Sequence, residues 1–119
     1  MYEVFNKFRK VREKNYPYII AEVGVNHECS MFKAKKMISL ASSAGANAVK
    51  IQSYKAELIA STNSPYYWDI KSEKSRSQFR LFKKFDKFEK ENYIELSKYC
   101  KKKKIKIISN PFGEKAIEF

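Results

Sequence analysis

Three short apolar runs, separated by segments with helical patterning, constrain the fold of this chain more than any other feature. The runs are Tyr18–Val23, Asn47–Gln52 and Lys103–Ser109. Their length and their content of valine and isoleucine are typical of strands rather than helices. Because strands alternate with helices, this order predicts right-handed βαβ units and a parallel sheet, which is the α/β class.

The segment after the first run carries the clearest helix signal. Ser30 is a favourable N-cap residue, and Gly45 stands where a helix would end. A second helix is predicted over Glu89–Cys100, where apolar residues again recur at helical spacing. The apolar stripe of the first helix consists of Ala34, Met37, Ile38 and Ala41.

Residues 53–88 form a long excursion after the second strand, polar and aromatic, with no single period. A connection this long without structure is unusual inside a compact domain, so we expect it to be partly helical and to lie over one end of the sheet. Residues 1–17 are expected to be an N-terminal extension. The whole chain, 1–119, is expected to be a single domain.

The net charge of +12 raises the question of an acidic partner. Residues 71–106 contain 14 Lys and Arg against 5 Asp and Glu. This region is either a solvated, lysine-rich face or a surface for nucleic acid or another polyanion. Nucleic acid is the less favoured partner, because surfaces that stack bases interleave arginine with exposed aromatic residues, and the chain has only four arginines.

The sequence also bears on the cellular compartment. No apolar run approaches the roughly 18 residues that a membrane-spanning helix needs, so no membrane partner is expected. The charged N-terminal segment lacks the apolar core of a signal peptide. Cys29 and Cys100 form no CxxC pair. These features favour a cytoplasmic protein with reduced thiols.

Each predicted strand ends in polar groups that can bind a ligand or transfer a proton. Because the carboxyl ends of parallel strands meet at one edge of a sheet, we expect these groups to lie together, where α/β folds place their active sites. The candidates are Glu22, Asn26 and His27 at the first strand, Lys50 and Gln52 on the second, and Ser109 and Asn110 at the third.

Lys50 is the most informative of these residues. A lysine inside "AVKIQ" cannot face an apolar helix layer without a large desolvation cost. It is therefore expected to point toward a barrel interior or a polar pocket, with Glu22 as a candidate partner. Two interpretations stay open: a buried Glu22–Lys50 ion pair without chemistry, or an anionic ligand bound between them.

The loop after the first strand holds three further residues of interest. His27 is the only histidine in the chain, so no multi-histidine metal site is possible and no metal ligand is assigned. It is either a hydrogen-bonding residue or a ligand. Cys29 has no evident base beside it, which disfavours a nucleophile. Gly24 is expected to allow an unusual backbone conformation.

The chain contains "IIAEVGVNH", "AKKMISLASSAGANAVKIQSYKAE" and "IISNPF" in this order. These motifs resemble the N-terminal third of the sialic acid synthases, a family that includes the legionaminate synthases. The resemblance runs from about Ile19 to Phe119. It implies a (β/α)8 TIM barrel, followed in the family by a small antifreeze-like domain. This chain would hold about three β/α units of that barrel, an incomplete barrel domain.

The resemblance also implies a reaction: condensation of phosphoenolpyruvate with an N-acetylated amino sugar, such as N-acetylmannosamine, to give a nonulosonic acid and phosphate. It implies a divalent metal, Mn²⁺ or Mg²⁺, whose ligands lie outside this chain, and a homodimer at full length. The 119-residue chain alone is expected to be inactive. The alternatives are a basic module that binds nucleic acid or polyanion, and a truncated, non-catalytic relic.

Roles follow from the motif matches. Glu22 matches a glutamate near the reacting carbons, suited to proton transfer or to stabilising positive charge. Lys50 matches the lysine that holds phosphoenolpyruvate, and Gln52 a glutamine of the sugar pocket. The remaining matches are Ser109 and Asn110, at the phosphoenolpyruvate end of the third strand, and Asn26 and His27, which shape the loop.

The chain departs from the family pattern in two motifs. Glu28-Cys29 replaces the usual Asn-Gly, so the loop is expected to fold differently and an added acid to alter substrate choice. Asn110 replaces a threonine that contacts phosphate, although its amide can still donate a hydrogen bond.

Overall fold

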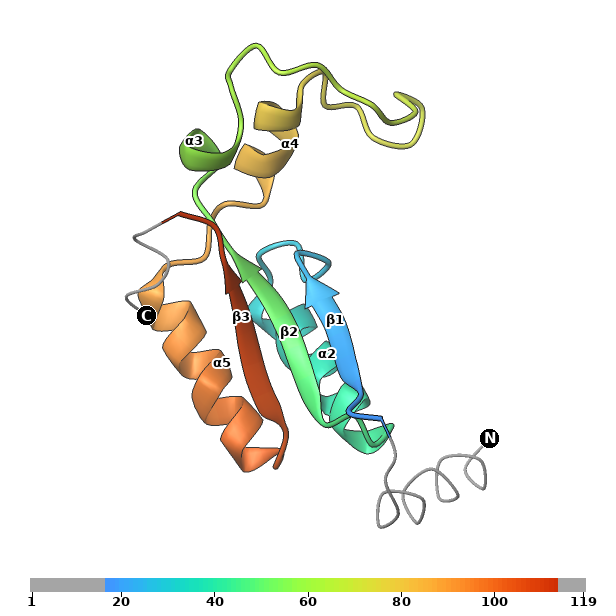
Figure 1. Ribbon diagram of the computed structural model, residues 1–119, viewed down its shortest axis with the longest axis vertical. Coiled ribbons are helices and arrows are strands. Elements are labelled where there is room, and N and C mark those ends of the chain that lie inside the picture. The colour runs from blue at the N-terminus through green and yellow to red at the C-terminus, as the bar shows by residue number, and fades with distance from the viewer. Residues whose placement is uncertain (1–16, 114–119) are drawn as a thin grey trace.

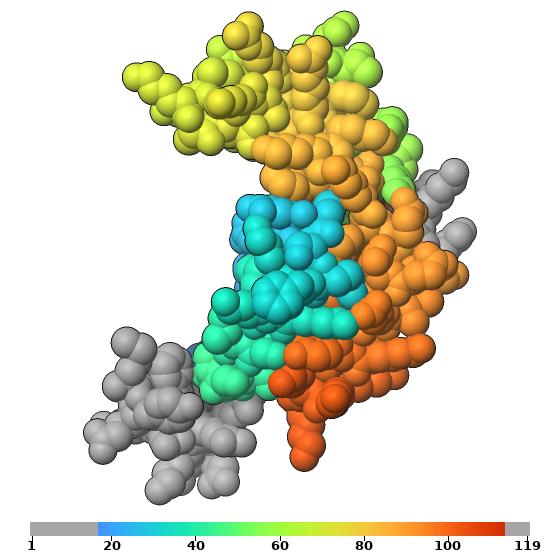
Figure 2. All heavy atoms as spheres, turned by 180° about the vertical axis from the view of Figure 1, so that it is seen from behind, coloured from blue at the N-terminus to red at the C-terminus, as the bar shows by residue number. Residues whose placement is uncertain are grey.

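The computed structural model describes residues 17–113. Its three strands are all parallel and lie in the order β1-β2-β3, as the sequence predicts (Figure 1). Two helices, α2 and α5, pack on one face of this sheet, and Figure 2, turned by 180° from Figure 1, shows the side that these helices cover. The bounds are β1 Ile20–Gly24, α2 Met31–Ser43, β2 Ala48–Ser53, α5 Lys90–Lys102 and β3 Lys106–Pro111.

Helix α2 begins and ends where the sequence indicates. The Ser30 hydroxyl accepts a hydrogen bond from the backbone N–H of Lys33 at 3.3 Å, which satisfies one of the unpaired donors of the first turn. Gly45 follows the helix with φ of +85°, a left-handed conformation that glycine adopts without strain. Ala34 and Ile38 are fully buried, so the predicted apolar stripe faces the core.

The hydrophobic core lies between the sheet and the two helices. Val49 and Ile51 of β2 are buried there together with Leu96 of α5. Side chains alternate across a strand, so Lys50 and Gln52 project from the opposite face. Within residues 17–113, no helix covers that opposite face (Figure 1).

The connection between β2 and α5 contains two short helices, α3 (Ala56–Ile59) and α4 (Gln78–Lys84). They form a lobe beyond the carboxyl ends of the strands (Figure 1), so the predicted excursion is indeed partly helical. The Tyr54 ring packs edge-on against Phe82, with centroids 5.9 Å apart. Among the described residues, no helix is long and apolar enough to cross a membrane.

Strand β3 lies further along the chain than predicted. Its start was placed at Lys103, but Lys103 and Lys104 still donate backbone hydrogen bonds to carbonyls of α5. Its end was placed at Ser109 because proline lacks an N–H, yet Pro111 pairs with Ser53. That prediction was wrong because Phe112, not Pro111, donates the next bond to the Ser53 carbonyl, at 2.9 Å.

Candidate functional site at the carboxyl ends of the strands

Glu22 and Lys50 form an ion pair across the first two strands. The two residues are register partners, and their side chains meet at 2.7 Å between Oε2 and Nζ. The Glu22 side chain is 48% exposed and that of Lys50 is 35% exposed, so the expected pair is present but is not buried. A half-exposed pair contributes at most about 1 kcal/mol to stability. Both charges therefore remain accessible to a ligand.

Gln52 lies close to Glu22 on the same face of the sheet. Gly24 sits beneath both, with φ of +54° as the sequence led us to expect. A Cβ at this glycine would lie 3.3 Å from Glu22 Oε1 and 4.0 Å from Gln52 Nε2. The absence of a side chain at Gly24 thus allows the carboxylate and the amide to converge over the end of β1.

The two candidates on β3 lie on opposite faces. Asn110 is the register partner of Gln52, so it shares the face of the Glu22–Lys50 pair. Ser109 projects to the helix side, where its hydroxyl lies 2.8 Å from that of Ser53. There it lines a hollow of about 380 Å³ between β3 and α5. The structure therefore brings Asn110, but not Ser109, to the face of the ion pair.

His27 is buried beside the site rather than exposed within it. Its imidazole is 2% exposed and stacks on Phe88 with ring centroids 4.4 Å apart. Its Nδ1 accepts a hydrogen bond from the Cys29 N–H at 3.1 Å, and burial lowers the pKa of His27 below its ordinary value. A neutral, stacked ring of this kind holds the loop in shape. Asn26 is exposed, and its N–H donates to the Val23 carbonyl at 3.0 Å.

Glu28 and Cys29 both adopt left-handed backbone conformations, with φ of +50° and +58°. This conformation disfavours side-chain-bearing residues, so local contacts must offset its cost. The Glu28 carboxylate pairs with the Lys33 ammonium on α2, and the Cys29 thiol donates to the Phe85 carbonyl at 3.0 Å. The added acid is thus held by α2.

The described residues at the candidate site do not form a set of ligands for a metal ion. Among the described residues, no group of three or more His, Cys, Asp or Glu side chains is placed to hold one. Residues 17–113 alone therefore do not fit a divalent metal.

Sequence reasoning missed Asp86, a carboxylate buried near the carboxyl end of β2. It accepts a hydrogen bond from the Ala56 N–H at 2.9 Å and lies 3.4 Å from the Lys55 ammonium. A signal was present: in "KKFDKFEK" this acid stands between Phe85 and Phe88, each two residues or fewer away. This signal was missed because the many lysines around Asp86 favoured the interpretation of a solvated surface.

Parallel β/α units with a charged cluster at the carboxyl ends of the strands are typical of α/β enzymes, whose sheet is either a (β/α)8 barrel or open. A model of the NeuB family matches residues 37–119, and the chain belongs to the NeuB family. It corresponds to the N-terminal part of the family's barrel, as the sequence motifs predict.

The proteins to which this chain is similar include sugar-acid synthases. It is 32% identical over 104 residues to N,N'-diacetyllegionaminic acid synthase of Legionella pneumophila, covering 86% of this chain and 29% of that protein. It is 34% identical over 104 residues to N-acetylneuraminate-9-phosphate synthase of Drosophila melanogaster, covering 86% and 27%. The chain thus spans less than a third of the length of these relatives.

A solved structure shares the fold. The crystal structure of N-acetylneuraminic acid synthetase from Leptospira borgpetersenii, in complex with citrate, superimposes with a TM-score of 0.71 at 31% identity. The alignment covers 87% of this chain and 32% of that one. The predicted fold, an N-terminal portion of a TIM barrel, is confirmed.

Proposed function

We propose that this chain supplies the first part of the active site of a synthase that condenses phosphoenolpyruvate with an N-acetylated amino sugar. The observation that carries the proposal is the accessible Glu22–Lys50 ion pair at the carboxyl ends of parallel strands. The relatives, which are legionaminic acid and N-acetylneuraminate-9-phosphate synthases, support the class of product. The acceptor is N-acetylmannosamine or a related diacetamido sugar.

Lys50 is proposed to hold the anionic substrate. Its ammonium now faces the carboxylate of Glu22 at 2.7 Å, and a phosphoenolpyruvate anion would take the place of that carboxylate. Because an ammonium is a compact point charge, it can exchange one anionic partner for another. The exchange would leave the Glu22 carboxylate unpaired beside the substrate.

Glu22 is proposed to act on the charges that then develop. The methylene carbon of phosphoenolpyruvate attacks the aldehyde carbon of the open-chain sugar, forming the C–C bond, and the aldehyde oxygen takes up a proton. The former enol carbon becomes cationic, adds water with loss of a proton, and expels phosphate to leave a ketone. A carboxylate beside this carbon stabilises the cation and can accept the proton from water.

Gln52 and Asn110 are proposed to orient the substrates. Both project from the face that carries the ion pair, and their amides can donate to hydroxyl or phosphate oxygens. The complete enzyme is proposed to be a homodimer that uses Mn²⁺ or Mg²⁺ bound by residues outside this chain. The described part alone is proposed to be inactive, since most of a barrel is missing from it.

Phosphate release tests this proposal. The full polypeptide that contains these residues is incubated with phosphoenolpyruvate and each candidate sugar, and inorganic phosphate is measured. Glu22→Gln and Lys50→Met are each expected to lower kcat/KM at least about 100-fold, as loss of a charge that acts in the transition state does. Lys36→Ala, on the exposed side of α2, is the matched control and should retain activity. Full activity in both site variants would refute the proposed site.

A further inference from the structure

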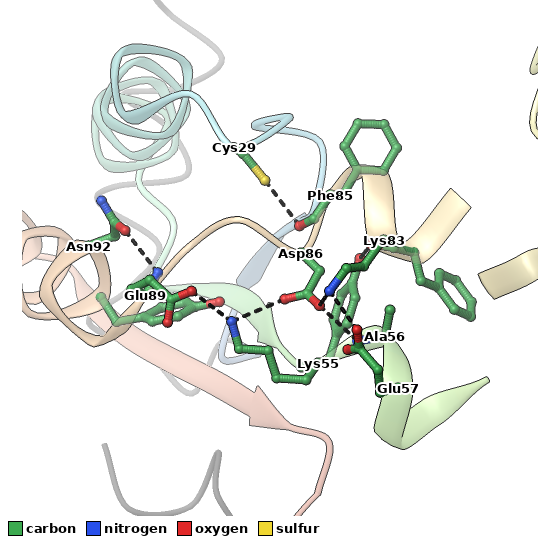
Figure 3. Close-up of polar contacts among 12 residues, drawn as sticks. Cys29, Lys55, Ala56, Glu57, Lys83, Phe85, Asp86, Glu89 and Asn92 are labelled. Carbon is green, nitrogen blue, oxygen red and sulfur yellow. Dashed lines mark hydrogen bonds and ion pairs between the residues drawn. The ribbon is translucent and has the colours of Figure 1, made fainter. Parts of the chain in front are cut away.

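A short connector, Phe85–Glu89, joins α4 to α5 and touches both loops that surround the candidate site (Figure 3). One is the β1 loop, Val25–Ser30, which follows Glu22 by three residues. The other is the turn at Lys55 and Ala56 that follows β2. Nothing in the reaction described above assigns a role to this connector.

Two contacts join the connector to the β1 loop. The Cys29 thiol donates to the Phe85 carbonyl at 3.0 Å (Figure 3). The His27 ring stacks on Phe88 at an interplanar angle of 13°. Since Nδ1 of His27 also accepts the Cys29 N–H, the thiol contact and the ring contact are linked by a hydrogen bond within the loop.

Asp86 joins the connector to the turn after β2. Its side chain has no exposed surface, and one oxygen accepts the Ala56 N–H at 2.9 Å. The ammonium groups of Lys55 and Lys83 lie 3.4 Å and 3.7 Å from its two oxygens, and Lys55 also bonds Glu89 at 2.8 Å (Figure 3). A buried carboxylate is tolerated only when it is paired in this way. Removing the Asp86 carboxylate would leave the buried Ala56 N–H without an acceptor, whereas Lys55 and Lys83 would keep Glu89 and Glu57 as partners.

We propose that Asp86 is a positioning residue for the candidate site. By fixing the connector against the β2 turn, it holds Phe85 and Phe88 where the β1 loop can dock on them. The docked loop in turn fixes the end of β1, where Glu22 and Gly24 lie. The structural coupling stands by itself, whereas its consequence for catalysis rests on the proposed function.

Hydrogen exchange of backbone amides in the β1 loop can report this coupling. The Glu28 N–H donates to the Val25 carbonyl at 2.9 Å, and the Ser30 N–H donates to the His27 carbonyl at 2.8 Å. These amides exchange slowly with solvent only while the loop is closed. Both amides donate to carbonyls of the loop and not to Asp86, so faster exchange confined to this loop after a change at Asp86 indicates transmission through the connector.

Hydrogen exchange of the full polypeptide tests the coupling. Asp86→Ala is expected to speed exchange of amides 25–30 by about tenfold or more, while amides of α2 stay protected. Asp86→Asn, which keeps an acceptor for Ala56, should restore part of the protection. The matched control is Glu57→Gln, which removes the exposed partner of Lys83 and should leave the loop unchanged. Unchanged exchange at 25–30 in Asp86→Ala, or an equal rise throughout the domain, would overturn the proposal.

Steady-state kinetics test the consequence for catalysis. Asp86→Ala is expected to lower kcat about tenfold with little change in KM for phosphoenolpyruvate, because Lys50 lies within β2 while Glu22 adjoins the loop. Cys29→Ala should act in the same direction, and Cys29→Ser, which keeps a donor for Phe85, should restore kcat. A rise in KM with unchanged kcat would contradict positioning of Glu22. If wild-type polypeptide releases no phosphate, the proposed function fails, and hydrogen exchange still decides the coupling.

Discussion

The imidazole of His27 lies flat against the ring of Phe88, 61 positions later in the chain, with centroids 4.4 Å apart. The histidine is 2% exposed, and its Nδ1 accepts a backbone hydrogen bond from Cys29. Protonation of Nδ1 would break that bond and place a charge in an apolar setting. The loop that borders the candidate site is therefore built around a neutral histidine.

Lowering the pH should reduce the free energy of unfolding of this protein because of His27. Burial lowers the pKa of the folded histidine below the ordinary value of 6.5, so the unfolded chain takes up the proton first as the pH falls. The stability contributed by the neutral ring is complete above about pH 6.5 and declines as the pH drops through that value toward the lower folded pKa. Urea unfolding between pH 8 and pH 5 would measure the decline. His27→Phe keeps a stacking ring without a titrating group, and the same pH slope in that variant would exclude His27 as the cause.

Loss of the Glu22–Lys50 ion pair should hardly change stability. Both side chains are half-exposed, and exposed pairs contribute roughly 0 to 1 kcal/mol. Lys50→Met and Glu22→Gln, alone and together, should give a coupling energy in this range by urea unfolding. A coupling well above about 2 kcal/mol would instead support a structural ion pair, as expected of buried pairs that lose one partner.

Alanine at Gly24 should disturb the site more than alanine at Gly45. Both glycines have positive φ, so each substitution should cost about 1 to 2 kcal/mol in backbone strain. At Gly24 the new Cβ would also lie 3.3 Å from Glu22 Oε1, whereas at Gly45 it would meet nothing within 4 Å. We expect Gly24→Ala to lose phosphate release as well as stability and Gly45→Ala to lose stability alone. Equal activity of the two variants would show that the approach of Glu22 to Gly24 is unimportant.

The lysine-rich end of α5 should bind nucleic acid only weakly. Lys101 and Lys102 stand in the last turn, where positive charge favours a helix, so their presence has a structural explanation. A gel shift against duplex DNA should show no more than non-specific affinity, with Kd of about 10⁻⁴ to 10⁻⁶ M at physiological salt. Tight binding that falls steeply with added salt would favour the polyanion-binding alternative instead.

Local patterns predicted most of the fold because they depend on neighbours in the chain. The spacing of Ala34 and Ile38 and the cap at Ser30 lie within a few turns of one helix, so the sequence was sufficient to place α2. The direction of the Lys50 side chain was equally predictable, because a charged group within an apolar strand turns away from the apolar helix layer. Strand ends were harder, because Lys103 and Lys104 can extend a helix as readily as start a strand.

The face on which each candidate lies depended on pairing between distant strands. Ser109 and Asn110 are adjacent in the sequence and equally polar, yet only the register with β2 sends Ser109 to the helix side and Asn110 to the ion pair. A shift of one residue would have exchanged them. Their local sequence carries no information about that register.

The sequence by itself determined the order of strands and helices, the family, and the edge of the sheet where polar groups gather, because each depends on local periodicity or on short motifs. Only the tertiary structure decided that Asp86 is buried and that Phe85 and Phe88 support the loop of His27 and Cys29. These contacts join residues 30 to 61 positions apart. They form where the connector after α4 packs against the loops that follow β1 and β2, and neither helical nor strand periodicity predicts contacts of this kind.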